Sequence, residues 1–520
     1  MRDIVVVGGG TAGWLAALKM QHSYRDCNIT LVKSDAIGIL GAGEGATPSL
    51  IDFLKSINIS EYDLIRHTSA TYKLGINFEN WNGDGASYFH GFLVDPDKMF
   101  DVVDNTSNPN VISQIISQGK NPDDYNASFT FARDRKSPFI PNPTDGADEQ
   151  MFRDDFSYRS KHLADSTKSA VNYSVHFNAV ELAGYLEQVA VERGINIIEG
   201  IVDNVHLDSN DYIDYLDLDN GNQLNVDFLF DCTGFHRLVT GKVYGSEWES
   251  LSEYLPMDQA QPFFLPPEED PSPWTQAIAQ DAGWIWKIPL QNRYGCGYVY
   301  DTSYISKDEV IKSIREQYPS AEIPDRVFKF NPGHFKTPLV KNSLAIGLAA
   351  GFVEPLEATS IMTFVLSLQA FKESNLLKIL TDPVARVNCS RFIKMGAEAC
   401  NEKIEQVNMH IAYFIQYHYL TQRQDTDFWN EYRNKSKQFE YVQARVEQLN
   451  TGNIFPASPL NNYLPIFDQS SWHVVGAGLG HIETESINLE DVDLENLRDA
   501  IDSLTEHAIP QQALVAACKG

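Results

Sequence analysis

A glycine-rich turn near the start of the chain constrains the fold more than any other feature. The apolar run Ile4-Val5-Val6-Val7 predicts a buried parallel strand, the turn Gly8-x-Gly10-x-x-Gly13 follows it, and residues 14–20 are predicted to form a helix. A second strand over residues 28–33 completes a βαβ unit. In this context the glycines allow a tight turn, a close approach of backbone to a pyrophosphate and close packing of helix on strand. The sequence therefore predicts a Rossmann-type dinucleotide site.

The rest of that site is marked less clearly. An acidic residue usually ends the second strand and holds the ribose, but this chain has Lys33 there, with Asp35 as an alternative. A second glycine-rich turn, which as a plain loop would be unremarkable, and an apolar run over residues 343–351 are further expected contacts. The predicted cofactor-binding residues are Gly8, Gly10, Thr11, Ala12, Gly13, Lys33, Gly43, Glu44, Ala46, Thr47, Gly347 and Leu348.

Charge and cysteine usage exclude several classes of function. The chain has 41 basic and 70 acidic residues and a formal net charge of -29, which disfavours nucleic acid and anionic membranes as partners. An anionic ligand must then be held by local backbone N–H groups against this mean field. No run reaches the ~18–20 apolar residues that span a bilayer. The 6 cysteines form no CxxC pair, so we expect reduced thiols, no metal site and a cytoplasmic protein.

Further motifs carry a resemblance to a known family. Gly283-Trp284-Ile285-Trp286-Lys287-Ile288-Pro289 contains W-x-W-x-I-P, and together with the N-terminal glycine turn it resembles the flavin-dependent halogenases of the tryptophan halogenase family. Thr71-Tyr72-Lys73-Leu74-Gly75-Ile76 is similar to the segment with the family's catalytic lysine, and Glu354-Pro355-Leu356-Glu357-Ala358-Thr359-Ser360 to the segment with its glutamate and halide turn. These motifs occur in the family's order, and the resemblance covers nearly the whole chain. The family's cyanophage-encoded, iodinating member is one candidate match.

The resemblance implies roles for individual residues. The catalytic pair would be Lys73 and Glu357, and backbone amides around Thr359 and Ser360 would bind halide. The W-x-W-x-I-P residues that would shield the flavin are Trp284, Trp286, Ile288 and Pro289. The expected substrate-binding residues are His90, Phe92, Phe428 and Trp429.

The same resemblance implies a chemistry and partners. FAD, reduced by a separate flavin reductase, would be used with O2 and halide to make hypohalous acid, which travels to Lys73. Lys73 would hydrogen-bond the acid as an ammonium or form a haloamine as an amine, and Glu357 would deprotonate the halogenated ring or polarise the halogen donor. A small aromatic molecule would be the substrate, and a homodimer is plausible because family members often dimerise.

The implied fold is α/β, a flavin monooxygenase-like FAD-binding core of Rossmann type with a mainly helical substrate-binding part. We predict a discontinuous core over residues 1–90, 165–245 and 330–375. The substrate-binding and helical C-terminal part is then expected over residues 91–164, 246–329 and 376–520.

Departures from the family pattern suggest a different substrate. Members that take free tryptophan grip its amino and carboxylate groups with two tyrosines and a glutamate, where this chain offers Tyr417, His418 and Gln424. Loss of the carboxylate removes the partner for an ammonium, so we expect a neutral indole, phenol or other electron-rich aromatic instead. Ala358 and Ser360 replace a common Ser and Gly in the halide turn, and iodide and bromide are favoured over chloride because they are easier to oxidise.

Each motif also has a structural interpretation. Lys73 alone is typical of a surface lysine, Glu357 of a helix cap, and W-x-W-x-I-P of an aromatic core strand. Two other functions stay open, an aromatic hydroxylase of the flavin monooxygenase type and a non-catalytic flavoprotein. Hydroxylation needs neither the tryptophan motif nor Lys73, so halide-dependent product would separate the first of these from a halogenase.

Overall fold

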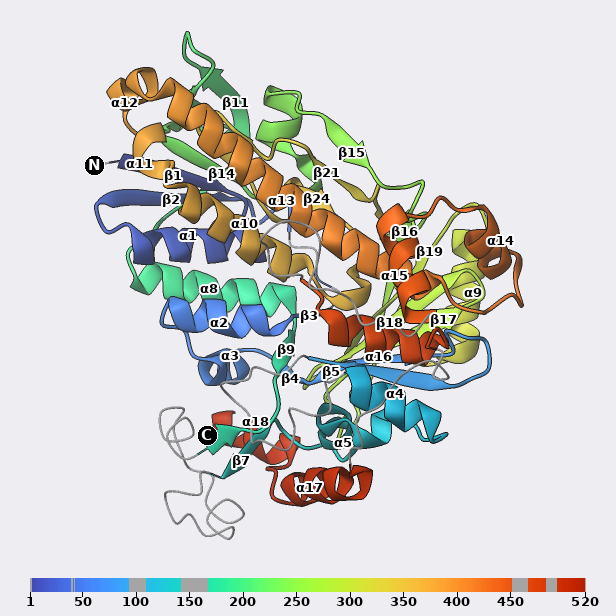
Figure 1. Ribbon diagram of the computed structural model, residues 1–520. Coiled ribbons are helices and arrows are strands. Elements are labelled where there is room, and N and C mark those ends of the chain that lie inside the picture. Colours follow the sequence, from blue (N-terminus) through green and yellow to red (C-terminus); the bar gives the residue numbers. More distant parts are fainter. Residues whose placement is uncertain are drawn as a thin grey trace.

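A parallel sheet built around the N-terminal strand forms one half of the molecule in the computed structural model (Figure 1). The structure describes residues 2–38, 41, 43–92, 109–141, 167–450, 466–482 and 493–519. The strand order is β10 (Asn196–Glu199), β2 (Cys27–Lys33), β1 (Arg2–Val7), β14 (Phe228–Asp231), β23 (Ser343–Ala345) and β22 (Leu339–Val340), of which β22 is antiparallel. The predicted βαβ unit is confirmed as β1, α1 (Thr11–Ser23) and β2.

The two faces of this sheet are covered differently. Helices α1, α8 (Ala179–Glu192) and α10 (Ser360–Ser374) pack on one face, where Ile4 and Val6 join the largest buried cluster. On the other face Val5 and Val7 pack against an antiparallel sheet of β11 (Val202–Leu207), β12 (Ile213–Leu218) and β13 (Gln223–Asn225). The alternation along β1 therefore buries both faces, as expected of a parallel sheet.

A second sheet forms the other half of the molecule. Its order is β20 (Phe328–Lys329), β16 (Gln259–Leu265), β19 (Tyr294–Tyr300), β18 (Gly283–Pro289), β17 (Thr275–Gln280), β5 (Gly75–Glu79) and β6 (Ser87–Gly91). Strand β17 runs parallel to β5, and the other pairs are antiparallel. Residues 75–90, which the sequence prediction assigned to the FAD-binding core, thus belong to strands that pair with the other part. The division into domains otherwise stays a prediction.

A short sheet connects the two halves. Strands β3 (Glu44–Gly45) and β4 (Thr71–Lys73) both pair with β9 (Ser174–Phe177), which brings together three segments far apart in sequence. Because β5 follows β4 after one residue, this short sheet leads directly into the second sheet. Lys73 therefore stands at the junction.

Helices surround this framework, and the longest, α13 (Ser390–Tyr419), runs from the parallel sheet to the second sheet (Figure 1). The other helices are α2 (Pro48–Ser56), α3 (Glu61–His67), α4 (Pro109–Ser117), α5 (Ala127–Arg133), α9 (Lys307–Gln317), α11 (Leu377–Leu380), α12 (Pro383–Asn388), α14 (Asp427–Lys435), α15 (Glu440–Asn450), α16 (Gln469–Leu479), α17 (Leu494–Glu506) and α18 (Gln511–Lys519). Smaller sheets are β15 (Trp248–Ser250), β21 (Gly333–Phe335) and β24 (Gly351–Phe352), and β7 (Phe139–Pro141) with β8 (Thr167–Ser169).

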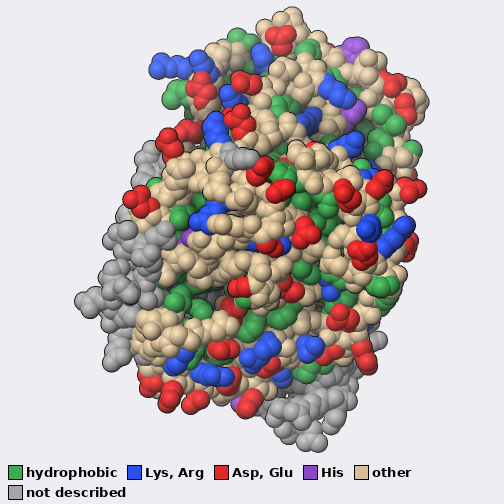
Figure 2. All heavy atoms as spheres, turned by 90° about the vertical axis from the view of Figure 1, so that its right-hand side faces the viewer, with side chains coloured by type: hydrophobic (Ala, Val, Ile, Leu, Met, Phe, Trp, Pro, Cys, Tyr) green, Lys and Arg blue, Asp and Glu red, His purple; other side chains and the backbone are tan. Residues whose placement is uncertain are grey.

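The surface is charged and mixed. Figure 2 shows acidic and basic side chains interspersed over one face of the molecule. Within the described ranges, no helix has the length and apolar character that a membrane span needs.

Candidate functional site

The glycine turn after β1 has the geometry of a nucleotide cradle. Gly8 adopts φ +125°, and a side chain there would collide with the carbonyl of Cys232 at the end of β14. A side chain at Gly13 would collide with the carbonyl of Gly8, so α1 packs directly on the turn. By contrast, a Cβ at Gly10 would meet nothing within 4 Å. The open side of the turn is therefore at Gly10, where a pyrophosphate would approach.

The N-terminus of α1 faces this opening. Gly10 is its N-cap, and no side chain caps the first-turn N–H groups, which leaves them available to an anion. The 3-10 turn Gly347–Ala349 reaches the same place, since Gly347 has φ +62° and its Cβ would lie 3.0 Å from the Cβ of Ala12. The residues present thus fit the pyrophosphate of FAD, and the distant segment at Gly347 lies beside them, while its contact with the cofactor stays a prediction.

Lys33 and Glu44 have surroundings that the sequence did not indicate. The Lys33 ammonium lies 2.9 Å from carboxylate oxygens of both Asp35 and Glu187, and its side chain is 17% exposed. Burial alone would lower the pKa of Lys33, but these two carboxylates outweigh it and raise the pKa. Desolvation raises the pKa of the Glu44 carboxyl to about 7. Cofactor contacts by Lys33 and Glu44 stay predictions.

Lys73 is completely buried, which is rare for a lysine. It ends β4 with 0% exposure, and its Nζ has no hydrogen-bond partner among the described residues. The ring of Phe92 lies 5.4 Å from Nζ. Burial lowers the pKa of Lys73 to about 7, against the opposing charge of Glu357. A dry, unpaired amine with this pKa exchanges its proton near neutrality, which suits a reactive group rather than a structural one.

Glu357 lies close to Lys73 but is bonded to two histidines. His90 Nδ1 lies 3.0 Å from both carboxylate oxygens of Glu357, and His418 Nε2 lies 2.7 Å from Oε1. Burial alone would raise the pKa of Glu357, but His90 and His418 outweigh it and bring the pKa to about 2. The carboxylate is therefore ionised across the neutral range, and it does not cap a helix through its side chain.

A buried network continues behind His418. Its Nδ1 lies 3.0 Å from the hydroxyl of Tyr88, and its ring stacks on Phe78 at 4.5 Å between centroids. Because Nε2 faces a carboxylate, the network assigns Nε2 as the protonated nitrogen and Nδ1 as the acceptor from Tyr88. Burial lowers the pKa of His418 although Glu357 opposes this, which favours the neutral ring. Residues of β5, β6 and α13 thus fix the Glu357 carboxylate.

The predicted halide turn follows directly after Glu357. Ala358 has φ +56°, a left-handed conformation that glycine adopts more easily than alanine, and Thr359 is the N-cap of α10. The Thr359 side chain makes no capping bond, so the first-turn N–H groups of this 15-residue helix are open to an anion. This geometry is compatible with halide binding near Thr359 and Ser360, which stays a prediction.

The tryptophan motif forms β18 and is held from two sides. Trp284 Nε1 donates to Oε2 of Glu354 at 3.1 Å, and the hydroxyl of Tyr419 donates to the same oxygen at 2.6 Å. Trp286 lies flat across the backbone of Gly297 on the neighbouring strand, and its Nε1 has no partner among the described residues. The carbonyl of Pro289 accepts the hydroxyl of Thr71, two residues before Lys73, at 2.7 Å. The motif is thus tied to the strand that carries Lys73.

The structure separates the predicted substrate-binding residues into two places. His90 and Phe92 lie beside Glu357 and Lys73, and the rings next to His90 are Phe414 at 5.5 Å and Phe467 at 6.2 Å. Phe428 and Trp429 are each 1% exposed and belong to an aromatic core on α14. That core is one layer behind His418, since Trp429 packs on Trp81 and donates to the carbonyl of Gln280. Their contacts are those of core residues.

The segment that suggested a substrate other than free tryptophan also has a structural role. The hydroxyl of Tyr417 donates to the carbonyl of Trp472 at 3.1 Å, and the side chain is fully buried. His418 is bonded to Glu357, and Gln424 is exposed at the surface. These residues therefore do not form an open grip for an amino acid.

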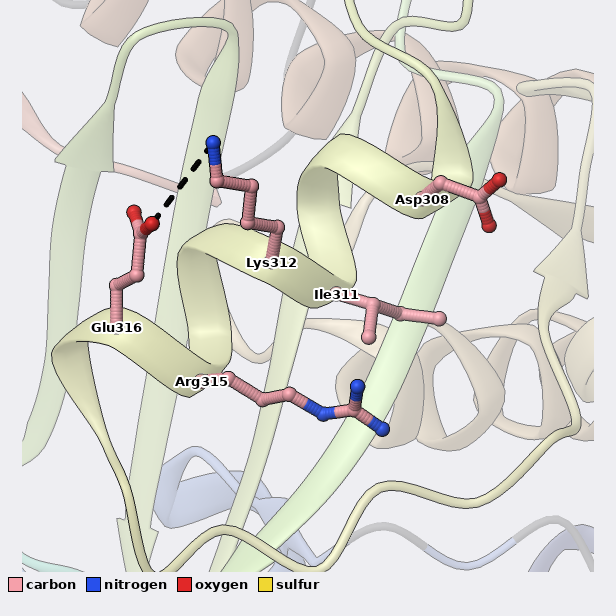
Figure 3. Close-up of a pocket in the computed structure, with 5 residues that line it drawn as sticks. All are labelled: Asp308, Ile311, Lys312, Arg315 and Glu316. Carbon is pink, nitrogen blue, oxygen red and sulfur yellow. Dashed lines mark ion pairs between the residues drawn. The ribbon is translucent and has the colours of Figure 1, made fainter.

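A surface hollow lies elsewhere, on the outer face of α9 (Figure 3). Its lining residues are Asp308, Ile311, Lys312, Arg315 and Glu316. Lys312 and Glu316 lie one helical turn apart with Nζ and Oε1 at 3.9 Å, both largely exposed. This is a solvated helix face, and the buried groups around Lys73 remain the better candidate site.

Several residues of the site were missed by reasoning from the sequence. Tyr88, His176 and Thr275 belong to no local motif that singles them out, Glu354 stands in the quoted motif without an assigned role, and His418 was interpreted only as a departure. Each acts through a hydrogen bond to a residue distant in sequence, so only the fold identifies them.

Comparison with known proteins gives consistent matches over most of the chain. The family model described as tryptophan halogenase matches residues 3–105 and 130–492. The 7-chloro-L-tryptophan 6-halogenase KtzR of Kutzneria sp. (strain 744) is 33% identical over 371 residues, which cover 69% of this chain and 70% of that protein.

Solved structures similar to this chain are also halogenases. The thermophilic tryptophan halogenase Th-Hal, from Streptomycin violaceusniger, has a TM-score of 0.82 at 28% identity, covering 98% of this chain and 100% of that one. BrvH, a flavin-dependent halogenase from Brevundimonas sp. BAL3, has a TM-score of 0.80 at 25% identity, covering 100% and 99%.

Proposed function

This chain belongs to the tryptophan halogenase family and is a flavin-dependent halogenase, and we propose that it uses reduced FAD, O2 and a halide to halogenate an electron-rich aromatic molecule. The observation that carries the proposal is the buried amine of Lys73, which lies beside the Glu357 carboxylate and has no hydrogen-bond partner in the part of the chain that the structure describes. Reduced FAD, supplied by a separate reductase, provides with O2 the oxidising equivalents that turn halide into hypohalous acid. The turn Gly8 to Gly13 and the N-terminus of α1 would hold its pyrophosphate.

Lys73 receives the hypohalous acid in this proposal. Its buried Nζ has no hydrogen-bond partner among the described residues, so a small neutral acid that reaches it gains a hydrogen bond in surroundings of low dielectric. Polarisation of the halogen by the ammonium then favours transfer to an aromatic ring. Because the pKa of Lys73 is about 7, the ammonium and the amine are both accessible near neutral pH.

Glu357 acts on the ring. The attacked ring becomes a cation and a strong acid, so a base of low pKa suffices to remove its proton. The ionised carboxylate also stabilises that cation before the proton leaves. His90 and His418 keep Glu357 ionised and oriented, which supports this role over that of a general acid.

The tryptophan motif and the N-terminus of α10 complete the proposal. Glu354 anchors Trp284 through a hydrogen bond. This supports a role of the motif as a rigid wall between the flavin and the aromatic substrate. Such a wall would disfavour hydroxylation of the substrate. The uncapped first turn of α10, at Thr359 and Ser360, would hold halide through aimed N–H groups in spite of the acidic surface.

We propose a neutral indole or phenol as substrate, and iodide or bromide in preference to chloride. Glu357 is bonded to two histidines, and Oε2 of Glu354 is bonded to Tyr419 and Trp284, while Oε1 of Glu354 has no partner among the described residues. Two histidines already engage Glu357, and burial raises the pKa of Glu354 to about 7, so neither is a strong counter-charge for a substrate ammonium near neutral pH, which supports poor use of free tryptophan. The aromatic rings of Phe92, Phe414 and Phe467 favour an apolar ring near His90.

A substrate-by-halide matrix tests this function. Purified protein is combined with FAD, a flavin reductase, NADH and chloride, bromide or iodide, and with indole, phenol or free tryptophan, and products are identified by mass spectrometry. We expect halogenated indole or phenol, most with iodide or bromide. Absence of halogenated product with every halide, in protein shown to bind FAD, contradicts the proposal, and halide-independent hydroxylated product supports a monooxygenase instead.

The variant Lys73→Ala tests whether Lys73 is needed for halogenation without being needed for FAD binding. We expect loss of halogenated product with FAD binding unchanged, because Lys73 is assigned to the acid and not to the flavin. Regioselective halogenation by this variant would show that another residue receives the hypohalous acid.

Size-exclusion chromatography of the purified wild-type protein tests the expected homodimer.

A further inference from the structure

His176 is a buried histidine beside Lys73 that the proposed function leaves without a role. It lies in the middle strand of the short sheet, with 0% exposure, and pairs in register with Thr71 of β4 and Gly45 of β3. Lys73 stands two residues after Thr71 on the same face of β4. Burial lowers the pKa of His176 well below its ordinary value, and the charge of Lys73 lowers it further, so the ring is neutral and carries one proton.

The hydrogen bonds around His176 place that proton. The hydroxyl of Thr71 donates to the carbonyl of Pro289 at 2.7 Å, so its oxygen accepts from His176 Nδ1, which lies 3.2 Å away. His176 Nδ1 therefore bears the hydrogen, and Nε2 is an acceptor. The hydroxyl of Thr275 lies 2.9 Å from Nε2 and donates to it. The chain of bonds runs in one direction, from Thr275 to the carbonyl of Pro289.

This direction leaves the Thr275 oxygen with lone pairs and no proton to give. The same oxygen faces the space beside Lys73. A Cβ added to Gly45 would lie 3.0 Å from Lys73 Nζ and 3.3 Å from Thr275 Oγ1. Because Gly45 has no side chain, the amine donor of Lys73 and the hydroxyl acceptor of Thr275 both come close to its backbone, and this place is called the Gly45 cradle.

Thr275 is held there by the fold. It begins β17 and pairs in parallel with Ile76 of β5, three residues after Lys73. The N–H of Leu74, next to Lys73, donates to the carbonyl of Pro273 at 2.8 Å. The strand that carries Lys73 and the strand that carries Thr275 are therefore fixed against each other at this point.

We propose that Thr275 is a catalytic residue that binds hypohalous acid in the cradle at Gly45, together with Lys73, and that His176 is the positioning residue that turns the Thr275 oxygen toward the acid. The acid's O–H donates to Thr275 Oγ1, and its oxygen accepts from Lys73 Nζ. Two contacts at an angle fix the direction of the oxygen–halogen bond, which one lysine with freely rotating N–H groups does not. The proposal rests on the proposed function and refines it, and it makes or breaks no covalent bond.

Thr275→Val removes the acceptor and keeps the shape, and Thr275→Ser restores the hydroxyl. The assay measures halogenated indole and, in parallel, halogenation of a freely diffusing β-diketone that traps escaped hypohalous acid. We expect Thr275→Val to lower the rate of indole halogenation about tenfold or more, with KM for indole unchanged, while the trapped fraction rises. Thr275→Ser should recover most of the rate. If Thr275 had only a structural role, its replacement would not change the ratio of trapped acid to halogenated indole.

Two further variants test the cradle and the positioning residue. Gly45→Ala adds a methyl group 3.0 Å from Nζ and 3.3 Å from Oγ1, which crowds both groups, and His176→Phe releases the Thr275 hydroxyl; both should raise the trapped fraction as Thr275→Val does. Thr505→Val is the matched control, since it removes a buried hydroxyl that bonds only its own helix at Ile501, in α17. It should leave rate and partition unchanged.

Failure of this inference can be distinguished from failure of the proposed function. If wild-type protein makes no halogenated product, the proposed function fails. If the wild type is active and Thr275→Val keeps both its rate and its trapped fraction, the inference alone is overturned. Equal loss in Thr275→Val and Thr275→Ser, with no change in trapped fraction and unchanged melting temperatures, likewise overturns it.

Discussion

Replacing Lys73 by Met should stabilise the protein while abolishing its activity. The side chain is fully buried, its Nζ has no hydrogen-bond partner among the described residues, and burial lowers its pKa from 10.5 to about 7. In the unfolded chain the lysine keeps its ordinary pKa and is protonated below pH 10.5. At about 1.36 kcal/mol per pKa unit, the folded state loses about 5 kcal/mol at acidic and neutral pH relative to a chain without this group.

The penalty that Lys73 places on stability grows as the pH falls. Above pH 10.5 the lysine is neutral in both states, so the penalty is absent; it grows as pH falls and is complete below about pH 7, where both states are protonated. Met has a similar length and no charge, so it fills the space without the penalty. The gain in unfolding free energy from Lys73→Met should be about 5 kcal/mol at pH 6 and about 2 kcal/mol at pH 9.

Thermal melting of both proteins between pH 6 and pH 9 checks this. For 520 residues, 5 kcal/mol corresponds to a rise in Tm of about 5 °C. Lys312→Met is the control, because Lys312 is 75% exposed and its removal should give no pH-dependent difference. A Tm difference for Lys73→Met that is zero, or that grows with rising pH, would refute the buried unpaired amine on which the proposed function depends.

Three other outcomes follow from the site. Glu357→Gln should lower halogenation by about 10²–10⁴-fold with FAD binding unchanged in a fluorescence titration, and near wild-type turnover would remove Glu357 from the chemistry. Gly10→Ala should leave the melting temperature of FAD-free protein unchanged but weaken FAD binding about tenfold or more, whereas Gly13→Ala should lower the melting temperature, because only its Cβ collides with the turn. Raising ionic strength with sodium acetate from about 0.01 M to about 0.15 M should not weaken FAD binding, since the mean field of a chain of net charge -29 opposes the anion; clear weakening would indicate a basic binding surface.

How far the sequence predicts this protein depends on the range of the interactions. The glycine turn is a local backbone device, so Gly8, Gly10 and Gly13 could be assigned roles from spacing alone, and β1, α1 and β2 form where expected. Lys73 and Glu357 could be named only through the family pattern, which does not explain their burial. Phe428 and Trp429 illustrate the limit, because a pattern of aromatic residues does not distinguish a substrate contact from a core contact.

The residues that tune the site are the ones that spacing does not reveal. His418 reaches Glu357 across 61 residues and His176 reaches Thr275 across 99, and each bond exists only because α13 and the short sheet bring distant segments together. Burial of these side chains is unfavourable in itself, since a buried lysine, a buried glutamate and buried histidines all lose hydration. The fold gives Glu357 two hydrogen-bond partners but gives Nζ of Lys73 none among the described residues, and this asymmetry locates the reactive group. A lysine that were paired as well as Glu357 would be more stable and would have no free N–H for hypohalous acid.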